Sequence, residues 1–205
     1  MTTCPSAAKL SVFLISLVAL NACSSKSDSK ADSTAIAPAA AVGTSTSSSR
    51  GNMQMSGMAN MTGDPDRDFL RMMSDHHKGL IAIVHPTLDK KENLAVKGDA
   101  SKMDKKQDTE IEKMITMLDQ QYKDAYTPSV MPDNQRMVDE LNGKSGVDYS
   151  RTFLKNVIAH HRQAVKMIDE YLPKAKNPQV KSMAEKMKSD QTKEIAELQK
   201  KLSVM

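Results

Sequence analysis

The second half of this chain repeats the first at an offset of 84 residues. At this offset the pair His76-His77 falls on His160-His161, and the same register holds on both sides of these pairs. The other matching positions are Phe69-Leu70 with Phe153-Leu154, Met103 with Met187, Gln107 with Gln191, Glu110-Ile111 with Glu194-Ile195, and Leu118 with Leu202. A single register that holds to the last leucine indicates internal duplication. Two copies are too few for a solenoid, which needs at least three.

Each copy predicts two helices, because its apolar residues recur at helical spacing. The expected helices cover residues 66–84 and 92–125 in the first copy, and 150–172 and 178–202 in the second. Asp64-Pro65 and Asn177-Pro178 each supply a capping residue followed by proline at the first helical position. Pro86 and Pro173 mark the expected ends of the first helix of each copy, with a kink inside the helix as the alternative at Pro86.

The two copies predict an all-α fold. A connector over residues 126–147 contains prolines and glycines and is expected to hold a short helix around residues 134–141. Two helical hairpins with one apolar stripe each bury those stripes best against one another. We therefore expect a four-helix bundle over residues 64–205, with repeats at 64–125 and 148–205.

The N-terminus has the form of a bacterial lipoprotein signal. An 11-residue apolar run covers residues 10–20, and Leu20-Asn21-Ala22-Cys23 resembles the lipobox, in which the cysteine is lipidated. We therefore predict a signal peptide over residues 1–22 and a lipid anchor at Cys23, with ordinary secretion as the alternative. Ser24 after the cysteine favours an exported protein on the periplasmic face of the outer membrane.

Residues 23–63 have the composition of a disordered linker. They are rich in Ser, Ala and Thr and hold few apolar side chains, so they cannot build a core. Four methionines fall within nine residues of this segment, at Met53, Met55, Met58 and Met61. Because no aliphatic residue accompanies them, two interpretations stay open. One is an auxiliary copper site, since thioethers suit Cu(I), and the other is a tether that at most absorbs oxidants.

The histidine pairs predict a polar layer inside the bundle. His76 and His160 lie in the apolar stripes of their helices, and the second histidine of each pair lies about 100° round the helix, at the edge. Gln107 and Gln191 occupy the stripes of the partner helices, with a glutamate beside each stripe. Buried polar groups must be paired. The layer is therefore either a set of His, Gln and Glu hydrogen bonds that fixes the helix register, or a metal site.

Methionines near the histidines favour the metal site. Met73 shares one helix surface with both histidines of the first pair, and Met72 lies one turn before His76. Met167 follows His160 by seven residues, two turns away, so it would need a ligand from another helix. Neutral imidazole and thioether suit Cu(I) or Ag(I) rather than Mg or Ca. We predict His76, His160 and Met73 as the principal ligands, followed by His77, His161, Met72 and Met167.

The composition argues against several other functions. The net charge is only +4, Trp is absent and aromatic residues make up 3%, which argues against a nucleic-acid surface. No run reaches 18 apolar residues. A di-iron centre needs Glu-x-x-His motifs, and none occurs. Without a glycine-rich phosphate loop or a recognisable catalytic triad, we expect no enzyme and no organic cofactor.

The motif F-L-x-x-M-x-x-H-H, followed downstream by Q-x-x-E-I-x-x-M, resembles the bacterial family called domain of unknown function 305. It is carried by residues 69–77 and 107–114 in the first copy, and by 153–167 and 191–195 in the second. The resemblance implies a ferritin-like four-helix fold, export and, in some members, copper binding through His and Met. The family motif usually has Met three residues before the His pair and six after it. Here the first copy keeps Met73 but has Ile83, and the second keeps Met167 but has Val157.

These predictions favour a lipid-anchored envelope protein that sequesters copper or hands it over. Each copy thus keeps one of the two motif methionines. Either Met73 and Met167 complement each other across the bundle, or the metal site is being lost and its positions are becoming ordinary core. A non-enzymatic scaffold whose His-Gln layer is structural is the alternative, and a ferritin-like oxidase is the third hypothesis. A metal ion and, through the lipid anchor, a membrane are the expected partners.

Overall fold

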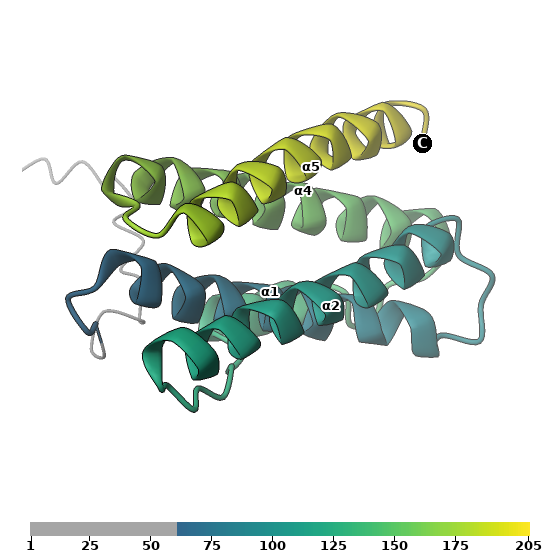
Figure 1. Ribbon diagram of the computed structural model, residues 1–205. Coiled ribbons are helices and arrows are strands. Elements are labelled where there is room, and N and C mark those ends of the chain that lie inside the picture. Colours follow the sequence, from purple (N-terminus) through teal and green to yellow (C-terminus); the bar gives the residue numbers. More distant parts are fainter. Residues whose placement is uncertain (1–60) are drawn as a thin grey trace, which may run out of the picture. The chain divides into compact units, whose positions relative to one another are not determined.

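The computed structural model describes residues 61–205 of the chain, and this part is helical, with no strand (Figure 1). The helices are α1 (Pro65–Asp89), α2 (Lys97–Tyr122), α3 (Pro132–Asp139), α4 (Gly146–Tyr171) and α5 (Pro178–Ser203), with one 3₁₀ turn, η2 (Leu172–Lys174). The predicted all-α class is confirmed. Within residues 61–205, no helix has the length and apolar character needed to cross a membrane.

Residues 1–60 lie outside the described part of the chain. The predicted signal peptide, the lipid anchor at Cys23 and the linker methionines Met53, Met55 and Met58 fall there and stay predictions. Met61 is described, precedes α1 and is 52% exposed.

The four long helices form two hairpins, as the repeat predicts. Helix α1 packs against α2, α4 packs against α5, and α1 also packs against α4. Phe69, near the start of α1, stacks on Tyr171 at the end of α4, with ring centroids 4.0 Å apart. At the other end, the Thr87 and Tyr149 hydroxyls are 2.9 Å apart. Helices α1 and α4 are therefore antiparallel.

Helix α2 also runs antiparallel to α5, along the same side of the bundle (Figure 1). Side chains join the two helices at several levels, with Lys106 Nζ donating to Glu194 and Gln121 Nε2 donating to Gln179 at 2.8 Å. With α1 antiparallel to both α2 and α4, the four helices form a closed antiparallel bundle.

The predicted caps form, but α1 is longer than expected. Asp64 Oδ1 accepts hydrogen bonds from two backbone N–H groups of the first turn of α1, and Asn177 Oδ1 does the same at α5. Helix α1 continues through Pro86 to Asp89 instead of ending near residue 84. Thr87 is fully buried and hydrogen-bonded to Tyr149, so tertiary contacts hold the turn that proline weakens.

The segment between the hairpins crosses the whole length of the bundle along α1. Its contacts follow α1 in order: Arg71 Nε donates to Asp124 at 2.6 Å, the Tyr126 hydroxyl donates to Asp75 at 2.6 Å, and Lys90 Nζ donates to the Lys144 carbonyl at 2.9 Å. One long crossover between two hairpins is the connectivity of ferritin-like bundles. The crossover explains why α2 and α4, although consecutive long helices, run in the same direction.

Helix α3, inside this crossover, packs closely on α1 at Gly79. A Cβ at residue 79 would lie 1.7 Å from Asn134 Nδ2, and Asn134 is itself buried. Glycine is therefore required at residue 79 by the approach of α3, since any side chain would displace Asn134.

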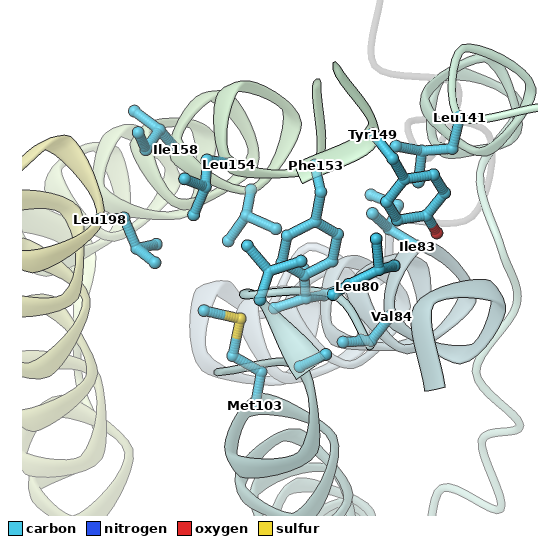
Figure 2. Close-up of a cluster of buried hydrophobic side chains, with 14 residues drawn as sticks. Leu80, Ile83, Val84, Met103, Leu141, Tyr149, Phe153, Leu154, Ile158 and Leu198 are labelled. Atoms are coloured by element: carbon cyan, nitrogen blue, oxygen red, sulfur yellow. The ribbon is translucent and has the colours of Figure 1, made fainter. Parts of the chain in front are cut away.

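Two clusters of buried apolar side chains fill the bundle, one toward each end. The aliphatic cluster, drawn in Figure 2, comprises Leu80, Ile83, Val84, Leu94, Val96, Ala100, Met103, Leu141, Tyr149, Phe153, Leu154, Val157, Ile158 and Leu198. The methionine cluster comprises Phe69, Leu70, Met73, Met114, Leu118, Ala164, Met167, Ile168, Tyr171, Val180, Ala184 and Met187. The histidine pairs fall between the two clusters along both α1 and α4.

Candidate metal site

The four paired histidines form one buried layer where α1 and α4 cross. The His76 and His160 rings face each other with centroids 3.7 Å apart and planes at 42°. His77 and His161 are 0% and 1% exposed, although the helical spacing placed them at the edge of the apolar stripe. They are buried because α2 covers that edge of α1, and α5 covers that edge of α4.

His77 and His161, the outer histidines of the layer, each contact a glutamate on the partner helix of their own hairpin. His77 Nε2 lies 2.8 Å from Glu110 Oε2, and His161 Nε2 lies 3.0 Å from Glu194 Oε2. The glutamates are partly exposed, so they connect the buried layer to the bundle surface. One interpretation of the sequence was a layer of His, Gln and Glu hydrogen bonds. The His–Glu hydrogen bonds of that layer are present.

The layer is nearly symmetric under exchange of the two repeats. The His76 and His77 ring centroids are 6.4 Å apart at 62°, and those of His160 and His161 are 6.5 Å apart at 61°. Since His76 and His160 occupy the same repeat position and touch each other, an approximate twofold axis passes between them.

The two central histidines have no hydrogen-bond partners within residues 61–205. Both ring nitrogens of His76 and of His160 are buried and unpaired, and so are the second nitrogens of His77 and His161 and the Gln191 side-chain oxygen. The His–Gln hydrogen bonds of the predicted layer are thus not formed at these nitrogens. An unpaired buried polar group costs about 1–3 kcal/mol, so six such nitrogens at one level require an explanation.

Burial keeps the central rings uncharged. Loss of solvation lowers the pKa of His76 to about 3, with smaller contributions from His77 and His161. Burial, followed by the neighbouring His76, lowers the pKa of His160 well below its ordinary value. Both imidazoles are therefore neutral at neutral pH, and each has a nitrogen lone pair able to bind a metal ion.

The structure brings the two retained motif methionines together. Met73 of α1 and Met167 of α4 both belong to the methionine cluster, whereas the repeat equivalents of these positions, Val157 and Ile83, both lie in the aliphatic cluster. The antiparallel crossing of α1 and α4 causes this, because residues before the pair on one helix meet residues after the pair on the other. One side of the histidine layer is thus rich in thioethers and the other is not.

Met72, another sequence candidate, and two unpredicted methionines lie on this side. Met72 is partly buried against the methionine cluster, and Met61 lies outside the helices. Met114 of α2 and Met187 of α5 are also buried in the cluster, although neither was singled out as a metal candidate from the sequence. The sequence did carry a signal for these two methionines, because both lie in the apolar stripe of the second helix of their repeat. Within residues 61–205, no group of three or more His, Cys, Asp or Glu side chains is placed to hold a metal ion.

Fold and site together define a class of protein: an antiparallel helical bundle of two repeated hairpins, with histidine pairs facing each other at the helix crossing. The chain belongs to the family described as Domain of unknown function (DUF305), whose model matches residues 18–118 and again residues 119–202. The family predicted from the histidine motif is thereby confirmed. No curated protein matches the chain.

Solved structures share this fold. The crystal structure of a DUF305 fragment from Deinococcus radiodurans is 23% identical, has a TM-score of 0.60, and aligns over 69% of this chain and 97% of its own. CopM in its Cu(I)-bound form is 25% identical and in its Ag-bound form 26% identical, each with a TM-score of 0.56. Each CopM alignment covers 66% of this chain and 93% of CopM.

Proposed function

We propose that this chain binds a soft metal ion, Cu(I) or Ag(I), at the crossing of α1 and α4, through His76, His160 and thioethers of the methionine cluster. The observation that carries the proposal is the pair of buried, neutral imidazoles whose four ring nitrogens have no partner. The metal-bound forms of CopM support it, because that protein shares the fold and is 25% or 26% identical to this chain.

The side chains present fit this kind of ion. Neutral imidazole and thioether prefer Cu(I) and related soft ions, whereas Mg and Ca require oxygen ligands. Met73 and Met167 approach the layer from opposite helices, which supplies the ligand from a second helix that a single helix cannot provide. Binding would consist of ligand exchange, in which the ion gives up weak ligands for two to four soft ones.

The ion is then cargo, and the chain sequesters it or hands it over. We propose that this takes place in the cell envelope, with the bundle tethered by lipid at Cys23 through the segment that precedes it. The apolar run and lipobox-like sequence before Cys23 support this location. The methionines at residues 53, 55, 58 and 61 would form an auxiliary, weaker site on that tether.

Two other functions are weaker. A purely structural histidine layer accounts for the bonds to Glu110 and Glu194, but not for the unpaired nitrogens of His76 and His160. An oxidase with a di-iron centre would need carboxylates as ligands, and both glutamates at this level are already engaged by His77 and His161. We therefore propose a non-enzymatic function.

A competition titration tests the proposal. The full chain is titrated with Cu(I) against a chromogenic Cu(I) chelator, beside a His76→Leu/His160→Leu variant and the control His85→Leu. His85 is an exposed histidine paired with Asp104, so it controls for binding by imidazole at the surface. Tight binding that is lost only in the double variant supports the proposal, whereas equal binding by all three chains overturns it.

A further inference from the structure

Two grooves between α2 and α5 lead to the histidine layer, and exchange of the repeats maps one onto the other. The first, of about 290 Å³, is lined by Met103 and by Glu194, which binds His161. The second, of about 280 Å³, is lined by Met187 and by Glu110, which binds His77. Met103 and Met187 are repeat equivalents, as are the two glutamates, so the grooves can be compared position by position.

Ion pairs line the first groove. Lys106 Nζ lies 2.6 Å from Glu194 Oε1, and Lys201 Nζ pairs with Asp99. The carboxylate that leads to His161 is therefore neutralised by a lysine of the opposite helix.

One acidic position of the first groove is a methionine in the second. Met183 stands where the first groove has Asp99, and Met117, the repeat equivalent of Lys201, lines the neighbouring, wider groove. The equivalent of Lys106 is Asp190, so Glu110 has no lysine from the corresponding position. Lys106, Lys113 and Lys186 also line this groove, and two of them, Lys106 and Lys186, are paired with acidic side chains.

Thioethers in the second groove continue from the surface to the core. Met183 and Met187 are four residues apart on α5 and share one helix face. Met183 is partly buried and also lines the neighbouring, wider groove with Met117, whereas Met187 is 2% exposed. Met187 belongs to the methionine cluster with Met73 and Met167, which adjoins the histidine layer.

We propose that the second groove is a separate soft-metal docking site, where Met183 and Met187 take up Cu(I) or Ag(I) before the ion reaches the buried histidines. This inference rests on the proposed function, to which it adds the route of access. The ion moves by exchange of one neutral ligand for another, so no electron or proton is transferred. The first groove takes no part, because Met103 is the one methionine in its lining, whereas the second groove has two.

Silver(I) and methionine methyl signals provide the test. The full chain, with Met53, Met55, Met58 and Met61 changed to Ser, is labelled with ¹³C-methyl methionine and titrated with silver nitrate, both with intact histidines and in the His76→Leu/His160→Leu background. We expect the Met183 and Met187 signals to shift in both backgrounds and the Met73 and Met167 signals to shift only with intact histidines. In Met183→Leu/Met187→Leu with intact histidines, the Met73 and Met167 signals should respond more slowly after silver is added. The control Met103→Leu, at the repeat equivalent of Met187, keeps the full response.

The outcomes separate this inference from the proposed function. If silver shifts Met73 and Met167 in the chain with intact histidines but leaves Met183 and Met187 unmoved, the docking site is wrong and the proposed function stands. If Met183 and Met187 shift but the histidine substitutions change nothing in affinity, the docking site stands and the core site is wrong. If Met103 responds as strongly as Met187, or no methionine responds, the docking site is also wrong.

Discussion

His76 and His160 occupy the same position in the two repeats, and their imidazole rings lie face to face with centroids 3.7 Å apart. Neither ring has a hydrogen-bond partner in the described part of the chain. Two unpaired polar rings at the centre of a bundle weaken it, so their presence is better explained by a ligand than by stability. The predictions below separate these two explanations.

Replacing both central histidines by leucine should stabilise the metal-free protein. The His76→Leu/His160→Leu variant removes four unpaired ring nitrogens and keeps apolar side chains of similar size. We expect the free energy of unfolding to rise by about 1–3 kcal/mol, measured by urea denaturation at neutral pH. A loss of stability of the same size would instead show that the layer is structural.

The methionines beside the layer should affect metal binding more than stability. Met73→Leu/Met167→Leu conserves volume, so it should cost less than about 1.5 kcal/mol of stability. We expect the affinity for Cu(I), measured by chelator competition, to fall by at least about 10-fold, because the loss of a group that only orients a metal ligand already costs about 10- to 100-fold. Ile83→Leu is the matched control, because Ile83 is the repeat equivalent of Met167. An equal loss of affinity in the control would contradict the assignment.

Added metal should stabilise the native bundle by mass action. At a free Ag(I) concentration 100 times the dissociation constant, the gain is about 2.7 kcal/mol. For a chain of this size we expect the Tm to rise by about 5–10 °C in a thermal melt. A soft-metal chelator should reverse the shift, and the His76→Leu/His160→Leu variant should show little of it.

Asp124 should make stability depend on acid pH. Hydrogen bonds from Arg71 and then Arg67 lower the pKa of Asp124 to about 2, below the ordinary value of about 3.9. Because the folded-state pKa is lowered, this stabilisation is complete above about pH 4 and is lost as the pH falls toward 2. We expect Asp124→Asn to lose about 1–2 kcal/mol at pH 7, measured by urea denaturation. The difference from the parent chain should shrink below pH 4, and a constant difference would contradict this origin.

The contact between α1 and α3 should tolerate no side chain at residue 79. A Cβ there would lie 2.4 Å from Asn134 Cγ, so Gly79→Ala must displace a buried side chain. We expect a loss of about 1–3 kcal/mol. In a double-mutant cycle, Asn134→Ala should recover part of this loss, because it removes the atoms nearest the new Cβ. Strictly additive effects would show that the strain lies elsewhere.

Much of the fold follows from local rules that the sequence displays. The 84-residue repeat, the apolar periodicity and the caps at Asp64 and Asn177 predict two helical hairpins, because helix formation and capping depend on neighbouring residues. The end of α1 does not follow from these rules. Pro86 predicts a break there, but burial of Thr87 against Tyr149, which is remote in sequence, keeps the helix intact.

The sequence alone also placed four histidines and two glutamines at one level, since equal repeat positions and helical spacing determine that level. The environment of each side chain depended on the packing of helices. His77 and His161 are buried because α2 and α5 cover the edge of each stripe, and Glu110 and Glu194 became their partners. Met73 and Met167 share one cluster because α1 and α4 cross antiparallel at the histidines. Spacing along a helix determines which face a residue occupies, whereas only the direction and crossing point of the neighbouring helix decide what that face meets.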